Sequence, residues 1–436
     1  MNAGRKFALT GLVLWLSACA TAPETRKDAK LTGPESGPAT AVSTAPKASE
    51  SKSGEAKAGD AKAGDAKAAV QPAPVAKSLS GQERDFTSAV EVARRGELTI
   101  AETALKALLE KSPKLGPAWT NLGIVQERQG RFPDAERSYR QALALEPDLE
   151  AAWDCLVRLS ARTGRAASLE AELREALTKQ DSVARRTALA LNLLLQKQHA
   201  AAVAEARRAL QVSEQHVPAM QVLAQVYARE GKFELASMVL GNALAIDAQD
   251  AATLNALGLV HLGLKERPQA LERFRQAIAL RPDFAEARNN LGTLLNEGED
   301  YASARVELEA AVKAAPDFAA AHLNLGNAYR GEGDFPRALA EYERVLQLQP
   351  DAKDPYFNLG LLHLDLEPAG MDPLERLQKA AAFLGQYQAR GGTDERTAQY
   401  LKDAQKGIDR ETRRRERERK EGLKKAAGPP PRPRRP

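Results

Sequence analysis

The sequence has few cysteines, histidines and aromatic residues, and each scarcity excludes a class of protein. Its 436 residues include only Cys19 and Cys155, which cannot build a disulfide framework. Five histidines without cysteine pairs show no zinc-ligand spacing, so we predict no metal and no cofactor. Aromatic residues make up 5% of the chain, and Ala, Leu, Arg and Glu are abundant. That composition favours helices over strands.

Long apolar runs are also missing, and the short one near the N-terminus has the features of a signal peptide. Arg5 and Lys6 precede an apolar stretch from Phe7 to Leu16, which is too short to cross a bilayer as a stable helix. Small residues follow it, as at a cleavage site. We therefore predict a signal peptide over residues 1–18.

The end of this segment, Leu16-Ser17-Ala18-Cys19, resembles the lipobox of bacterial lipoproteins. The resemblance implies that Cys19 is acylated and becomes the mature N-terminus, and Ala20 after it implies sorting to the outer membrane. We expect a lipid-anchored protein that faces the periplasm, with exposure at the cell surface left open. The alternative is an ordinary signal peptide with an incidental cysteine.

Residues 19–81 contain few large apolar side chains and are predicted to form a disordered tether. Ala, Lys, Ser, Gly and Pro dominate this stretch, which cannot bury enough surface to offset chain entropy. Its simplest function is that of a passive spacer between the membrane and the folded part.

A period of 34 residues organises the rest of the chain. Trp119 and Trp153 are one period apart, and Leu-Gly and Pro-Asp pairs recur at the same interval. Small residues at the glycine positions let two helices approach closely, and proline ends the second helix. The recurring positions are Leu257, Leu291, Leu325 and Leu359, each followed by glycine, and Pro282, Pro316 and Pro350, each followed by aspartate.

This pattern resembles the tetratricopeptide repeat (TPR), a helix–turn–helix unit, and implies an all-α superhelical solenoid of about nine repeats. Gly130 and Gly333 are predicted to form the turn within their repeats. The segment 183–216 lacks the usual landmarks, so we expect looser packing or a bend there. The predicted domains are TPR block 1 (82–182), a degenerate TPR (183–216), TPR block 2 (217–390), a charged capping helix (391–423) and a disordered basic Pro/Arg tail (424–436).

In the TPR family, defined positions of the first helix face a concave groove that binds peptides. Asparagines occupy one of these positions in consecutive repeats, and an amide can both donate to and accept from an extended peptide. Hydrogen bonds between stacked helices are the alternative role. The predicted groove residues are Asn121, Asn255, Asn289, Asn290, Asn324, Asn327, Arg330, Asn358, Leu259, Leu323, Phe357 and Leu361.

Apolar residues in this set indicate a surface that a partner peptide covers. The alternative occupant is the chain's own C-terminal helix. Basic residues gather near the C-terminus, where Arg413, Arg414 and Arg415 form the densest run. That basic tail could contact anionic lipid or another envelope protein, or serve solubility alone.

No catalytic motif stands out, so we predict a protein that is not an enzyme. The chain lacks a phosphate-binding glycine loop with lysine, a metalloprotease helix motif and a glycine-flanked serine elbow. The resemblance implies a lipid-anchored scaffold for protein–protein interaction in an envelope-spanning machine, for gliding or type IV pilus motility. Regulation of periplasmic cell-wall synthesis enzymes is the alternative. We expect an envelope protein or peptide as partner, and neither nucleic acid nor a small-molecule substrate.

Overall fold

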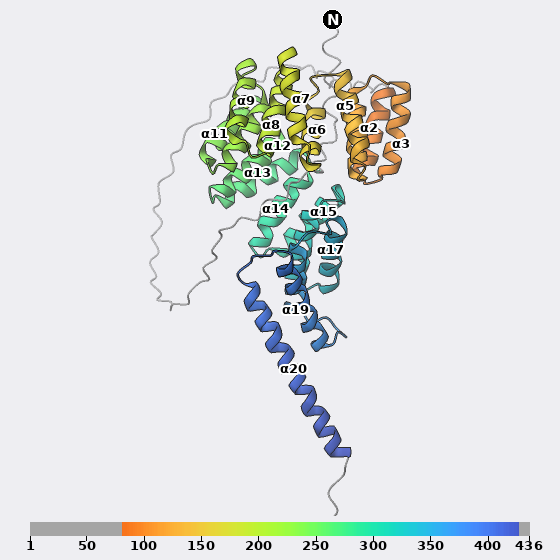
Figure 1. Ribbon diagram of the computed structural model, residues 1–436, viewed down its shortest axis with the longest axis vertical. Coiled ribbons are helices and arrows are strands. Elements are labelled where there is room, and N and C mark those ends of the chain that lie inside the picture. The colour runs from red at the N-terminus through yellow and green to blue at the C-terminus, as the bar shows by residue number, and fades with distance from the viewer. Residues whose placement is uncertain (1–80, 427–436) are drawn as a thin grey trace, which may run out of the picture. The chain divides into compact units, whose positions relative to one another are not determined.

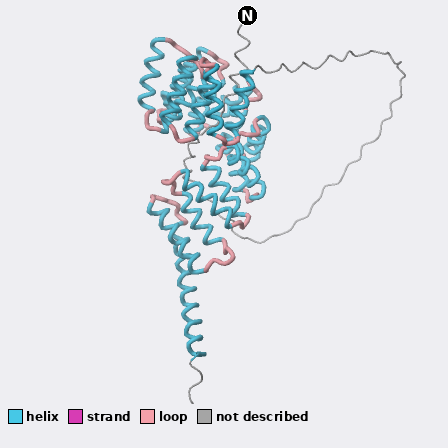
Figure 2. Tube along the Cα trace, turned by 90° about the vertical axis from the view of Figure 1, so that its right-hand side faces the viewer, coloured by secondary structure: helices cyan, strands magenta, loops and turns pink. Residues whose placement is uncertain are grey.

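The computed structural model describes residues 81–426, which form helices and no strand (Figure 1, Figure 2). Cys19, the signal peptide, most of the tether and the end of the basic tail lie outside these residues. Nine antiparallel helix pairs follow one another, and a long final helix comes last. The predicted all-α solenoid is confirmed. The pairs are α2 (Gly81–Arg94) with α3 (Leu98–Lys111), α4 (Gly116–Arg128) with α5 (Phe132–Leu145), α6 (Glu150–Arg162) with α7 (Ala166–Lys179), α8 (Val183–Leu195) with α9 (His199–Val212), α10 (Val217–Arg229) with α11 (Phe233–Ile246), α12 (Ala251–Gly263) with α13 (Arg267–Leu280), α14 (Ala285–Glu297) with α15 (Tyr301–Ala314), α16 (Ala319–Gly331) with α17 (Phe335–Leu348), and α18 (Asp354–Asp365) with α19 (Pro373–Ala389).

Within a pair, the two helices meet at the glycine of the Leu-Gly motif. A Cβ atom at Gly326 would lie 2.5 Å from Cε1 of Tyr342, whose ring is fully buried. At Gly258 the corresponding distance, to Cε1 of Phe274, is 2.4 Å. The facing ring lies against the helix backbone and leaves no space for a side chain. These positions therefore require glycine.

The turns within the repeats use the left-handed backbone region, and glycine supplies it at most of them. Gly130 and Gly333 have φ of +77° and +80°, as predicted. Three repeats lack the glycine, and there Lys197, Lys265 and Glu299 take φ of 60–64°. Packing of the helices on either side therefore imposes the turn even where the residue disfavours it.

The expected looser packing in the degenerate repeat is not seen. Its two helices, α8 and α9, have regular lengths, and Leu189 and Leu193 of α8 are almost fully buried. One hydrophobic cluster extends from Phe86 to Val260 and passes through this repeat. Leucines in α8 thus compensate for the missing landmarks.

The final helix, α20 (Thr397–Ala426), packs by its first half on α19. Ala404 is fully buried there, and a Cβ on Gly407 would lie 2.9 Å from Leu377. Terminal repeats of a solenoid need such a cover because one face has no neighbouring repeat. Among the described helices, none combines the length and apolar character needed to cross a membrane.

Candidate peptide-binding groove

All the predicted asparagines except Asn121 come from the first helices of four consecutive repeats, α12, α14, α16 and α18. Asn255 is in α12, Asn289 and Asn290 are in α14, and Asn324 is in α16. The 34-residue period gives these helices corresponding faces, which explains why the asparagines line up from repeat to repeat.

Hydrogen bonds connect these asparagines across repeats. Asn290 Nδ2 donates to Asn255 Oδ1 at 2.9 Å. Asn324 Nδ2 donates to Asn289 Oδ1 at 2.9 Å and to Thr293 Oγ1 at 2.8 Å. The amides therefore stack neighbouring first helices, one of the two roles that the sequence left open. An amide has two N–H donors and an oxygen with two lone pairs, so each pair retains hydrogen-bonding capacity for a ligand.

Two other predicted asparagines lie in different surroundings. Asn121 is fully buried in α4, and its Nδ2 donates to the carbonyl oxygen of Pro117 at 2.9 Å. It belongs to a repeat far along the chain from the cluster of α12 to α16. Asn358 in α18 is partly exposed, and its side chain has no hydrogen bond to the described residues. Asn358 can therefore be changed with less effect on the fold than the asparagines that connect helices.

The predicted apolar residues differ in exposure. Leu259 in α12 is 47% exposed, whereas Leu361 in α18 is only 7% exposed and lies within the core. Leu323 is partly exposed but packs against the core of the later repeats. An apolar surface open to a partner therefore exists at Leu259, while the prediction of an apolar groove wall does not hold for Leu361.

The chain itself covers Phe357. The ring of Phe357 lies 5.1 Å from that of Tyr387 in α19 and 6.0 Å from that of Tyr400 in α20. The guanidinium of Arg396 lies 5.7 Å from the centre of the same ring. At this end of the array, the start of α20 thus occupies part of the surface that the sequence assigned to a peptide.

Asn327 and Arg330 contact the second helix and the last repeat. Asn327 Oδ1 accepts a hydrogen bond from the Tyr342 hydroxyl at 2.9 Å, and burial raises the pKa of that tyrosine. Arg330 Nη1 pairs with Asp365 at 2.5 Å. Its Nε is buried and has no hydrogen-bond partner, which costs about 1–3 kcal/mol unless a further group satisfies it.

Asn296 is a groove residue that the sequence reasoning missed. Its Nδ2 donates to the backbone oxygen of Asn324 at 2.9 Å, while its Oδ1 is buried without a partner. Asn296 precedes Arg330 by one 34-residue period. Neighbouring repeats therefore hold one buried acceptor and one buried donor that lack hydrogen-bond partners. Reading this column of the repeat across all units would have revealed it.

The histidines of the later repeats have structural surroundings. Nδ1 of His322 lies 2.6 Å from Glu341, and its Nε2 lies 3.1 Å from the oxygen of Pro316. His363 is 2% exposed, with its ring 5.1 Å from the ring of Phe335. Burial lowers the pKa of His363. Both rings are therefore engaged in holding helices together.

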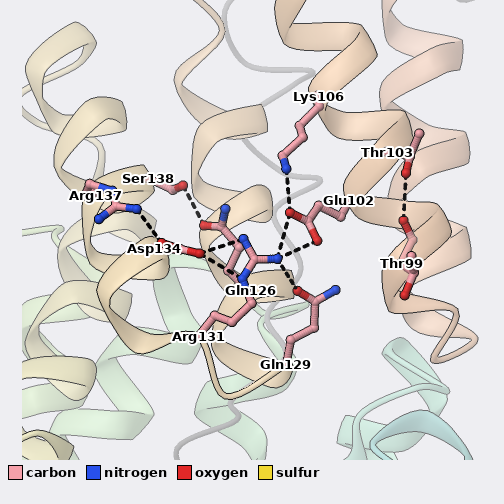
Figure 3. A network of polar contacts seen from close by, with 10 residues as sticks. All are labelled: Thr99, Glu102, Thr103, Lys106, Gln126, Gln129, Arg131, Asp134, Arg137 and Ser138. Carbon is pink, nitrogen blue, oxygen red and sulfur yellow. Dashed lines mark hydrogen bonds and ion pairs between the residues drawn. The ribbon is translucent and has the colours of Figure 1, made fainter.

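The polar network in Figure 3 connects the first two repeats. Arg131, in the turn before α5, donates to both carboxylate oxygens of Glu102 in α3 at 2.9 Å and contacts Asp134. Burial alone would raise the pKa of Glu102, but hydrogen bonds from Lys106 and Arg131 outweigh it and hold the pKa below its ordinary value. These carboxylates are occupied by cations, as in a structural ion-pair network. Within residues 81–426, no cluster of His, Cys, Asp and Glu is arranged to hold a metal ion.

Comparison with known proteins agrees with this geometry. Residues 116–149 and 255–319 match the family described as tetratricopeptide repeat, and residues 326–366 match the TPR repeat family. The chain thus carries tetratricopeptide repeats, and its helix pairs form a solenoid of that class. No curated protein matches the chain.

Several solved structures are similar to it. The structure of the APC/C hetero-tetramer Cut9-Hcn1 aligns with a TM-score of 0.55 and 19% identity over 74% of this chain. The present chain spans 63% of that one, and the likeness shows the fold alone. PilW, a widely conserved type IV pilus biogenesis factor, is 21% identical over 50% of this chain and 96% of its own, with a TM-score of 0.43. YrrB, described as a TPR protein with an unusual peptide-binding site, is 21% identical over 42% of this chain and 95% of its own, with a TM-score of 0.32.

Proposed function

We propose that the protein is a non-enzymatic scaffold that binds an extended peptide segment of a partner along α12, α14, α16 and α18. The asparagine arrangement carries this proposal. Asn255, Asn289, Asn290 and Asn324 bring amides from three repeats together, and each amide retains unused donors or acceptors. Such groups bind a peptide backbone irrespective of its side chains, as in other extended-peptide sites.

Nearby groups strengthen the proposal. Asn296 Oδ1 and Arg330 Nε are buried without partners, so a side-chain movement that lets a ligand or a water molecule reach them stabilises the site. Leu259 offers an exposed apolar side chain on α12 for a neighbouring residue of the peptide. Specificity then comes from the apolar contact, and affinity from both kinds of contact.

The cellular setting belongs to the same proposal. Cys19 in the lipobox-like sequence would carry the lipid, and residues 19–81 would let the repeats reach well away from an outer membrane. A scaffold of this kind suits assembly of an envelope-spanning machine, with gliding or type IV pilus motility as the first candidate. This assignment rests on architecture, which many functions share.

The test is cross-linked co-purification from membranes, comparing wild type with the combined variant Asn290→Ala, Asn324→Ala and Asn358→Ala. We expect a partner recovered with wild type to fall at least about tenfold in the variant, since each lost hydrogen bond costs about 0.5–1.5 kcal/mol. The matched control is Asn242→Ala, an exposed asparagine on α11, and it should recover the partner at the wild-type level.

Circular dichroism must show both variants folded, because the first two asparagines also connect helices. Unchanged recovery in the triple variant would refute peptide binding at this face. Where recovery does fall, the identity of the partner indicates the machine. The phenotype of a deletion strain tests the same point: loss of movement or pili indicates motility, and altered wall composition indicates regulation of wall enzymes.

A further inference from the structure

Helix α20 carries a row of basic residues on the side turned away from α19. Their spacing of four, three, four, three and four residues places them within an arc of about 80°, since an α-helix turns about 100° per residue. The face formed by Ala404, Gly407 and Glu411 lies on the other side of the helix, toward α19. The row, named the basic stripe, consists of Lys406, Arg410, Arg413, Arg417, Lys420 and Lys424.

Ion pairs neutralise the flanks of α20 but leave most of the stripe charged. Arg414, beside the stripe, pairs with Glu411 at 2.5 Å and with Glu418 at 2.9 Å. Arg415 pairs with Asp372 and, at 3.1 Å, with Glu411. Hydrogen bonds from Arg414 and Arg415 lower the pKa of Glu411 to about 2.

The stripe itself has one such partner. Lys406 lies 3.5 Å from Asp403. For the other five stripe residues, no carboxylate of the described chain lies within ion-pair distance. Five cations without a carboxylate partner are therefore collected on one face of α20, whereas Arg419 and Lys425 lie on its other sides.

This face is open along its whole length. Every stripe residue is exposed, and beyond Arg415 every described residue of α20 is exposed. In both Figure 1 and Figure 2, the C-terminal half of α20 extends past α19 with no other helix beside it. The stripe spans about 27 Å at 1.5 Å per residue. Leu423 is the one large apolar residue after Ile408 in the helix, so the surface has little that could insert into a hydrocarbon layer.

We propose that the basic stripe binds the phosphate headgroups of an anionic lipid bilayer, with the second half of α20 lying along the surface. Guanidinium and ammonium groups are phosphate ligands, and a straight row of them matches a plane of phosphates. Clusters of four to eight Lys or Arg on a helix are sufficient for such binding. Hot spots of protein interfaces lie in well-packed, desolvated pockets, whereas every stripe residue is exposed on one side of a straight helix, which favours a flat lipid surface. This inference goes beyond the peptide-binding proposal and does not depend on it.

The test measures vesicle flotation of the full chain carrying Cys19→Ser, using phosphatidylcholine vesicles with and without phosphatidylglycerol. We expect binding that requires phosphatidylglycerol and weakens as salt is raised. The stripe variant Arg413→Gln, Arg417→Gln and Lys420→Gln should bind about a hundredfold more weakly, because each basic residue at the surface contributes about fivefold.

The control variant Arg414→Gln, Arg419→Gln and Lys425→Gln removes the same charge from the other sides of α20. It should retain most of the wild-type binding, and circular dichroism should show both variants equally helical. If vesicle binding falls equally in the two variants, the position of the charges on the helix does not matter and the stripe is not the binding surface. Equal binding of the wild type to vesicles with and without phosphatidylglycerol would overturn the proposal altogether. So would a chain that does not float with anionic vesicles but captures an acidic protein.

Discussion

Replacing Gly326 by valine is expected to lower the free energy of unfolding by about 3 kcal/mol. The first added atom would lie 2.5 Å from Cε1 of Tyr342, and the valine methyl groups add to this overlap. Tyr342 is fully buried and cannot swing out of the way without opening the interface between α16 and α17. Urea unfolding followed by circular dichroism measures the loss, and amide exchange should locate it in α16 and α17.

Gly241→Val is the matched control for this prediction. Gly241 lies inside α11, and no atom is within 4 Å of its added Cβ. We expect a change within about 0.5 kcal/mol. A double variant with Tyr342→Ala should be less destabilised than the sum of the two single variants, since the smaller side chain makes room for valine. Additive losses would contradict the packing account.

Removing residues 394–436 is expected to destabilise the last repeat by about 3–6 kcal/mol, through loss of apolar burial. The deletion takes away Tyr400 and Ala404, which cover the outer side of the final helix pair. It also removes the backbone N–H of Asp394, which donates to the Tyr387 hydroxyl at 3.2 Å. Amide exchange in α18 and α19 should accelerate about a hundredfold or more.

A shorter truncation separates covering from charge. Removing residues 421–436 leaves the packed half of α20 and the Arg415–Asp372 ion pair in place, so exchange in α18 and α19 should stay at the wild-type rate. If amide exchange in α18 and α19 is as slow after the longer truncation as after the shorter one, α20 does not act as the cap of the last repeat.

Much of the fold could be predicted because the 34-residue period reports packing directly. Leu-Gly and Pro-Asp pairs mark where helices meet and end, and the structure places a helix pair in every unit. The degenerate repeat was harder because missing landmarks suggested loose packing. Leu189 and Leu193 fill that core instead, and Lys197 accepts a left-handed turn that glycine usually supplies. Tertiary packing thus overrides local preference.

For the candidate site, the sequence predicted which residues share one face of the first helices, but not the contacts that they make. Spacing identifies which residues share a side of a helix, but it does not determine side-chain rotamers or neighbours in the next repeat. The sequence therefore could not predict the hydrogen bond between Asn290 and Asn255 or the burial of Leu361. Asn296 was missed although Arg330, at the same position of the next repeat, was among the predicted residues. The basic residues near the C-terminus were considered by their total charge, so the regular spacing from Lys406 to Lys424 was likewise missed.

The most direct measurement of the central claim, that the first helices of the later repeats bind a partner, is site-specific photo-cross-linking in intact cells. A benzoylphenylalanine at Leu259, 47% exposed on α12, reports on the proposed groove. One at Val306, 54% exposed on the second helix α15, serves as the matched control. We expect a discrete adduct from position 259 that position 306 does not give and that disappears with the Asn290, Asn324 and Asn358 alanine changes. The same adducts from both positions, or an adduct from position 259 that survives those changes, would contradict the account.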